Sequence, residues 1–187
     1  MLKKIINRIL NLYYNKTIPL KYYNKKYKIM KRTSIDNYSD IGFNTYIGYN
    51  CFITKSKIGN YCSIGNNVHI GPGEHDLNKI STSAIMYKNS YEELTKEDCT
   101  LGNDVWVGAD AIVLRGVKIG DGAVIGANSV VTHDIPDFAV AVGSPAKVIK
   151  YRFSQKDINK IKKSNWWLYD KEKAKNIINQ LENKASE

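Results

Sequence analysis

Aliphatic residues recur at every sixth position through most of the chain. One series begins at Ile29 and pauses after Ile70, with a single residue lost on the way, and a second series runs from Leu101 to Val131. An amphipathic helix would repeat its apolar residues about every 3.6 positions, so this period argues for short strands. The aliphatic positions are Ile29, Ile35, Ile41, Ile47, Ile53, Ile58, Ile64, Ile70, Leu101, Val107, Val113, Ile119, Ile125 and Val131.

A second class of residue keeps the same period, three places after most of the aliphatic ones. Asparagine, aspartate and glycine dominate there, and these residue types tolerate a positive φ. We therefore expect the chain to turn a corner at a fixed place in each repeat. The predicted corner residues are Asn44, Asn50, Asn67, Gly73, Asp104, Asp110, Gly116, Gly122, Asn128 and Asp134, and Ser56 and Tyr61 break the pattern.

This regularity predicts an all-β solenoid over residues 29–153. A series of ordinary hairpins would not keep so constant a spacing. Three repeats of six residues make one triangular coil, and 3 × 6 = 18 residues per coil. Stacked coils pair as parallel strands and bury a continuous column, so no coil is stable alone.

The segments on either side of the repeat are expected to be helical. Residues 1–28 form a basic N-terminal segment, and residues 154–187 form a C-terminal extension that Trp166, Trp167 and Leu168 anchor on the coils. The first helix either lies on anionic lipid or caps the first coil, because solenoid ends need covering. Its apolar face would carry Leu2, Ile5, Ile6, Ile9, Leu12 and Tyr13.

The excess positive charge is confined to the N-terminal segment. Residues 1–32 contain ten of the 28 basic residues and no acidic residue, so the other 28 − 10 = 18 basic residues balance the 18 acidic ones. A nucleic-acid-binding protein usually spreads basic residues over one face of its fold, and we expect no nucleic-acid partner. The asymmetry favours a local anionic neighbour, such as a membrane surface or an acidic substrate.

The remaining composition predicts a cytoplasmic protein. No apolar run approaches the ~20 residues that span a bilayer. The opening MLKKIINRIL is interrupted by charge too often for a secretion signal. Three cysteines, Cys51, Cys62 and Cys99, match no zinc or redox spacing. Contact of residues 1–16 with the inner face of the membrane is compatible with this location.

Two runs, IGNYCSIGNNVHIG and LGNDVWVGADAIVLRGVKIGDGAVIGANSVV, resemble the hexapeptide-repeat acyltransferases. The segment GPGEHD, the following STSAIMY, the ending GSPAKVIKYRF and the later Trp-Trp pair are similar to xenobiotic acetyltransferases, which modify chloramphenicol and streptogramins. Sugar and polysaccharide O-acetyltransferases share most of these features. The resemblance covers roughly residues 29–153. It implies a left-handed helix, acetyl-CoA as the acyl donor, no metal, and a homotrimer whose sites lie between two chains.

The interruption at residues 72–100 is the first candidate for chemistry, because long excursions from a rigid scaffold commonly carry function. In the family, a histidine at the start of such a loop is the general base, which implies this role for His75. Histidine titrates near neutral pH, so it can take a proton from an attacking hydroxyl and return it to a departing thiolate. His69 has an outward strand position, where an exposed or interface histidine is expected.

The coenzyme site is predicted from spacing and resemblance together. Ala109 and Ala127 are 127 − 109 = 18 residues apart, so they should stack at one corner and leave backbone groups approachable by an extended ligand. The resemblance implies that they contact the pantetheine arm of CoA. It also implies coenzyme contacts at Trp106, at the acyl end, at Thr132 and His133, further along the arm, and at Lys147 and Lys150, near the phosphates. An interface tryptophan, a turn histidine and solvated lysines are the competing interpretations.

These observations predict an acetyl-CoA-dependent O-acetyltransferase that acts on a hydroxyl of a bacterial glycan or sugar precursor. An antibiotic O-acetyltransferase is the alternative within this class. Two functions outside the class also suit the predicted fold: a zinc-dependent enzyme like the carbonic anhydrases of similar fold, and a non-catalytic solenoid. His69 and His75 should point from adjacent faces of the coil, which disfavours shared zinc ligation within a chain.

Overall fold

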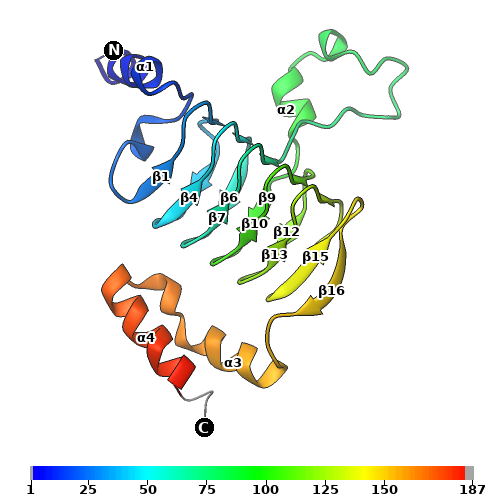
Figure 1. Cartoon of the computed structure of the whole chain (residues 1–187). Helices are drawn as coiled ribbons and strands as arrows, with labels where there is room; N and C mark the ends of the chain where they lie inside the picture. Colours follow the sequence, from blue (N-terminus) through cyan, green and yellow to red (C-terminus); the bar gives the residue numbers. More distant parts are fainter. Residues whose placement is uncertain (1, 184–187) are drawn as a thin grey trace.

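A computed structural model of the chain describes residues 2–183. It shows a left-handed triangular solenoid with a helix at its N-terminal end and, after the last coil, two helices that run along its side back toward the first coils (Figure 1). The predicted all-β solenoid is confirmed. No helix within the described range is long and apolar enough to cross a bilayer.

Short parallel strands form three faces, named here in chain order. The first face holds β1 (Tyr27–Ile29), β4 (Thr45–Ile47), β7 (Ser63–Ile64), β10 (Trp106–Val107), β13 (Val124–Ile125), β15 (Ala139–Val142) and the antiparallel β16 (Lys147–Tyr151). The second face holds β2 (Ser34–Ile35), β5 (Phe52–Ile53), β8 (His69–Ile70), β11 (Ile112–Val113) and β14 (Val130–Val131). The third face holds β3 (Asp40–Ile41), β6 (Ser56–Ile58), β9 (Cys99–Leu101) and β12 (Lys118–Ile119).

The six-residue aliphatic series forms the core. All fourteen predicted positions are buried, and they stack on one another between successive coils, as Ile47 does on Ile64. Because neighbouring coils bring the same residue type to the same place, each face buries one continuous aliphatic column. Small residues, including Cys51, Cys62 and Ala111, fill the interior beside the corners.

The corners follow the predicted pattern at eight positions and depart from it at two. Positive φ values occur at Asn44, Asn50, Asn67, Asp104, Asp110, Gly116, Gly122 and Asn128. Gly73 has none because the chain has already left the coil there, and Asp134 instead accepts a hydrogen bond from the Lys118 N–H with its carboxylate (2.7 Å). Tyr61, which lacks the expected residue type, also has a positive φ of 60°.

Side chains close the corner between the third and first faces as a ladder. In each coil, an asparagine or aspartate oxygen accepts a hydrogen bond from a backbone N–H of the coil before it, which satisfies a donor that the turn would leave open. The pairs are Phe43 to Asn60 (3.0 Å), Asn60 to Asn103 (2.9 Å), Asn103 to Asp121 (2.7 Å) and Asp121 to Asp137 (2.9 Å).

The excursion leaves the solenoid between the second and third faces. It begins after Ile70, contains η2 (Ala84–Met86) and α2 (Ser90–Leu94), and ends where β9 resumes at Cys99. Cys99 and Thr100, placed in the loop by the sequence pattern, pair with Ser56 and Lys57 and therefore belong to the solenoid. The loop stands away from the coils (Figure 1).

The two ends of the chain are built differently. The first coil is closed by Ile18 and by Tyr22 of η1 (Leu20–Tyr22), both buried in the core, whereas α1 (Leu2–Tyr14) buries no residue. The C-terminal α3 (Gln155–Ser164), η3 (Trp166–Leu168) and α4 (Lys171–Asn183) form a second apolar cluster, with Trp166 and Trp167 packed near Phe138. The prediction that Leu168 helps to anchor this unit is wrong. Leu168 is 60% exposed and lies outside the apolar cluster that contains the two tryptophans.

Candidate active site

His75 lies near the start of the excursion, in the irregular segment of residues 72–76, and is exposed to solvent. Tyr87, a buried residue further along the loop, holds this segment in place. Its hydroxyl accepts a hydrogen bond from the Asp76 N–H (3.0 Å), and its ring meets the His75 imidazole edge-on at 5.8 Å between centroids. The neighbouring Glu74 N–H donates to the Leu94 carbonyl (2.9 Å), so the segment is fixed on both sides of the histidine.

Arg115 fastens both ends of the excursion to the solenoid. It sits at the same corner, one coil further on, and its guanidinium donates to the carbonyls of Gly71 and Pro72 where the chain leaves and to the Glu97 carbonyl (3.1 Å) where it returns. The same group donates to the Thr54 and Lys55 carbonyls (3.1 and 3.2 Å), which lie at this corner two coils before Arg115. Burial lowers the pKa of Arg115, yet guanidinium stays protonated in proteins, so these bonds are charge-assisted.

The loop also extends along this corner to the first coil. Tyr91 of α2 donates a hydrogen bond to the Asp36 carboxylate and stacks on Tyr38, with ring centroids 5.3 Å apart. The Lys55 ammonium donates to the Thr95 carbonyl (2.6 Å). These contacts hold the far part of the loop, so the segment is anchored at several points along the corner.

Thr132 and His133 lie at this same corner, one coil beyond Arg115. Both follow β14 directly, and the Thr132 hydroxyl is 2.8 Å from His133 Nδ1. His133 is exposed, whereas Thr132 is half-buried. The structure therefore gathers His75, Arg115, Thr132 and His133 along the corner between the second and third faces, here called the loop edge.

Ala109 and Ala127 stack at a different corner, between the first and second faces, as their 18-residue spacing predicts. The Asn128 N–H donates to the Ala109 carbonyl (2.9 Å). A side-chain ladder like that of the corner between the third and first faces begins here but is interrupted. Asn66 Oδ1 still accepts from the Tyr49 N–H (2.9 Å), but alanine offers no acceptor to the coil before it. Within residues 2–183, the N–H groups of Asn66, Ala109 and Ala127 have no hydrogen-bond partner.

We call this corner the alanine edge. A row of open N–H groups on a rigid corner suits a ligand that carries several carbonyl oxygens in an extended arrangement. The alanine methyl groups keep the approach to these donors free.

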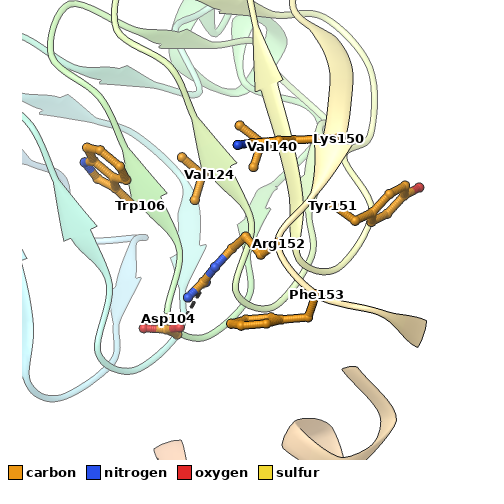
Figure 2. A pocket seen from close by; sticks show the side chains of 8 residues that line it. All are labelled: Asp104, Trp106, Val124, Val140, Lys150, Tyr151, Arg152 and Phe153. Atoms are coloured by element: carbon orange, nitrogen blue, oxygen red, sulfur yellow. Dashed lines mark hydrogen bonds and ion pairs between the residues drawn. The ribbon is translucent and has the colours of Figure 1, made fainter. Parts of the chain in front are cut away.

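Trp106 and Lys150 share a pocket of about 590 Å³ on the first face (Figure 2). Trp106 points outward from β10 and is 57% exposed, as its strand position predicts. An ion pair between Asp104 and Arg152 (3.3 Å) closes one end of the pocket. Burial raises the pKa of Asp104, and Arg152 partly offsets that effect. The remaining lining residues are Val124, Val140, Tyr151 and Phe153; Lys147 lies on β16 outside this lining.

The predicted site residues thus fall in three places. Within one chain, the second face separates His75 from the alanine pair, and Thr132 and His133 lie with the histidine rather than with the alanines. Arg115 and Tyr87 were not predicted. The six-residue period marks only the neighbouring Gly116 as a corner residue, and nothing in the loop sequence distinguishes the buried Tyr87 from the exposed tyrosines. Among the described residues, no three His, Cys, Asp or Glu side chains are close enough to hold a metal ion.

Comparison with known proteins supports the fold and the repeat. Residues 98–133 match the bacterial transferase hexapeptide (six repeats) family. A chloramphenicol acetyltransferase of Morganella morganii is 47% identical over 81 residues, which cover 43% of this chain and 39% of that protein. A probable macrolide acetyltransferase of Lysinibacillus sphaericus is 41% identical over 92 residues, 49% of each chain. The matches thus span two fifths to one half of these relatives' lengths.

Solved structures give a longer match. A maltose O-acetyltransferase from Clostridium difficile 630 superposes with a TM-score of 0.61 at 26% identity, covering 81% of this chain and 87% of that chain. A hexapeptide-repeat acetyltransferase from Vibrio cholerae O1 biovar eltor, in complex with acetyl coenzyme A, has a TM-score of 0.52 at 21% identity, over 75% and 70% of the two chains, and shows the shared fold. In its repeat and in its triangular left-handed coil, the chain thus resembles the hexapeptide-repeat acyltransferases, and residues 98–133 carry their hexapeptide repeat.

Proposed function

We propose that the protein transfers an acetyl group from acetyl-CoA to a hydroxyl of a bacterial glycan or sugar precursor. The observation that carries this proposal is the placement of a loop-root histidine and a row of open backbone N–H groups on the two edges of one face. The fold on which they sit is shared along most of the chain with a maltose O-acetyltransferase. The assignment of His75 as the base comes from its place at the root of the anchored loop.

In the proposed reaction, an imidazole nitrogen of His75 accepts the proton of the acceptor hydroxyl. The oxygen then attacks the thioester carbonyl carbon, and the resulting tetrahedral intermediate collapses to release the CoA thiolate. His75 returns its proton to the sulfur, so the acetyl ester and the free thiol form without a covalent enzyme intermediate. Tyr87 and Arg115 hold the segment that carries the histidine, which keeps the base in position before the acceptor arrives.

The alanine edge is proposed to hold the coenzyme. Its open N–H groups would donate to the amide carbonyls of the pantetheine arm. Trp106 and Lys150, in the pocket on the adjacent first face, are proposed to contact the coenzyme as well, with Lys147 near its phosphates. Thr132 and His133 would reach the same coenzyme from the loop edge of a neighbouring chain.

A homotrimer brings the two edges together. The second face has a mainly apolar outer surface, where the Phe52 ring lies 5.0 Å from His69 and the row continues through Ile112 and Val130. The third face instead points Asp40, Lys57, Thr100 and Lys118 outward. Packing three second faces around a common axis would cover the apolar row and set the loop edge of one chain beside the alanine edge of the next.

The trimer is tested by measuring mass in solution. We expect Ile112→Asp to yield monomers that have lost turnover, because a charge would be buried without a partner. Thr100→Asp, an equivalent change on the third face, should leave the trimer intact. An active wild-type monomer would contradict a site shared between chains.

The acceptor is tested by release of the CoA thiol with a panel of acceptors. We expect turnover with glycan or nucleotide-sugar hydroxyls, which would suit a protein that works in the cytoplasm on glycan assembly. An antibiotic hydroxyl is the second candidate, since chloramphenicol acetyltransferases are among the proteins similar to this chain. Efficient turnover of chloramphenicol or a streptogramin without turnover of any sugar would replace our proposal with that one.

A further inference from the structure

The N-terminal helix is attached to the protein by its polar side. Asn11 Oδ1 accepts hydrogen bonds from the Ile18 N–H (3.0 Å) and from the Tyr23 hydroxyl (2.7 Å). The Tyr14 ring lies 5.7 Å from the ring of Tyr23, and Lys16 lies over both rings. These contacts fix α1 (Leu2–Tyr14) through residues that a surface helix normally turns to water.

The opposite side of α1 is apolar and uncovered. At about 100° per residue, six aliphatic and aromatic side chains, those of Leu2, Ile5, Ile6, Ile9, Leu12 and Tyr13, span an arc of about 120°. None of them is buried, and several are more than half exposed: Leu2 is 70% exposed, Ile9 59%, Leu12 77% and Tyr13 79%. The helix therefore presents the surface that an ordinary amphipathic helix packs against its own core. Ile5 and Ile6 complete this surface.

Positive charge borders the apolar arc. Lys3 lies on one side of it and Arg8 on the other, with Lys4 beyond, and no acidic residue occurs before Asp36. An anionic surface is complementary to such a helix, because the apolar arc can enter the acyl boundary while the flanking cations contact the headgroups. The solenoid does not require α1 as a cap, since Ile18 and Tyr22 already close the first coil.

We propose that α1 docks the protein on the surface of an anionic bilayer, with Leu2, Ile5, Ile9 and Leu12 entering the boundary between headgroups and acyl chains. Docking uses neither His75 nor the alanine edge, so it stands independently of the proposed reaction. In a trimer with parallel solenoid axes, three such helices would lie at the same end, and their binding would reinforce one another.

The test is co-sedimentation of the full-length protein with vesicles. We expect binding to phosphatidylcholine vesicles that contain phosphatidylglycerol, weaker binding at high salt, and none to phosphatidylcholine alone. Ile9→Asp should lower binding by at least about tenfold, because a charge would enter the apolar boundary. Its melting temperature should not change, since Ile9 is exposed. Ile80→Asp, at a fully exposed loop position, is the matched control and should bind as the wild type does.

Two results would overturn the proposal: the absence of binding to the anionic vesicles at low salt, and binding that Ile9→Asp leaves unchanged. If binding is absent and the free protein instead associates in a concentration-dependent way that Ile9→Asp abolishes, the apolar face is covered by a second copy of the chain.

Discussion

The guanidinium of Arg115 donates a hydrogen bond to the backbone carbonyl of Gly71, the residue at which the chain leaves the solenoid. Gly71 has a φ of 63°, and a Cβ added there would lie 2.7 Å from the Thr54 carbonyl oxygen. Only glycine fits at the point where the loop leaves the solenoid, because there is no room for a Cβ. The backbone of this glycine is held by an arginine from the next coil.

Replacing Arg115 with alanine should free both ends of the excursion. We expect turnover to fall by roughly 10–100-fold with little change in acetyl-CoA affinity, because the histidine loses its support while the alanine edge is untouched. Buried carbonyls left without a donor should cost about 1–3 kcal/mol of stability. Steady-state kinetics and limited proteolysis of residues 72–98 measure the two effects. Lys118→Ala, on the exposed third face, is the control. Normal turnover of the variant together with faster proteolysis of the loop would show that the hydrogen bonds of Arg115 to the loop do not serve catalysis.

Replacing His75 with alanine should reduce turnover by roughly 10²–10⁴-fold while the coenzyme still binds, since only the general base is lost. His133→Ala should behave differently and raise the KM for acetyl-CoA with a smaller change in kcat. Comparing kcat and KM for the two variants separates a proton-transfer role from a binding role. Near-normal turnover of His75→Ala on the true acceptor would remove this residue from the reaction.

Ala127→Asn should restore the broken ladder. An amide oxygen at this position would accept from the Ala109 N–H, as Asn66 accepts from Tyr49. We expect the melting temperature to stay the same or rise, whereas acetyl-CoA affinity should fall at least about tenfold because a donor is consumed and the approach is narrowed. Calorimetric titration measures the affinity.

Asn103→Ala makes the reverse change, the removal of a ladder acceptor, at the corner between the third and first faces. It should cost about 1–2 kcal/mol of stability, because the Asn60 N–H loses its acceptor, and leave the affinity unchanged. If Ala127→Asn binds acetyl-CoA with the affinity of the wild type, the alanine edge is not the coenzyme site.

The three cysteines should resist thiol reagents in the folded protein. Burial raises the pKa of Cys62 to about 12 and that of Cys99 to about 11, and it also raises the pKa of Cys51. Only the thiolate reacts, so at pH 8 a disulfide reagent should titrate these thiols slowly before denaturation and all three afterwards.

The same shifts predict a loss of stability at alkaline pH. A thiol whose folded-state pKa is raised stabilises the fold below its ordinary value of 9.0, and this contribution disappears as the pH rises toward 11 and 12. Cys62→Val should flatten the decline of melting temperature over this range. Rapid reaction of all three thiols at pH 8 in the folded state would contradict the burial.

The sequence predicted the solenoid well because its signal is periodic. Burial of residues such as Ile47 follows from position in the repeat, and most corners follow from residue type. Tyr61 is a corner residue that its residue type did not predict. Its positive φ is compensated by packing against Trp166 and by a hydrogen bond from its hydroxyl to the Tyr169 carbonyl (2.8 Å), contacts made with a segment far away in the chain.

The candidate site was less predictable for a related reason. The support that Arg115 gives to the loop depends on which carbonyls a neighbouring coil brings within reach, and no local pattern encodes that. The amphipathic pattern of residues 2–13 predicted a helix but not which side would meet the protein. The hydrogen bonds of Asn11 decide this, and they turn the apolar side outward.

The third face passes the excursion without any change of register. β9 pairs with β6 and β12 in the same register as the strands of an uninterrupted coil, although 28 residues separate Ile70 from Cys99. At this corner a segment can therefore be inserted, exchanged or lengthened without a change in the coils or in the alanine edge. Under the proposed function, the loop can change while the coenzyme site on the alanine edge does not. Grafting a relative's loop between Ile70 and Cys99 is then a direct way to ask whether the excursion sets the choice of acceptor hydroxyl.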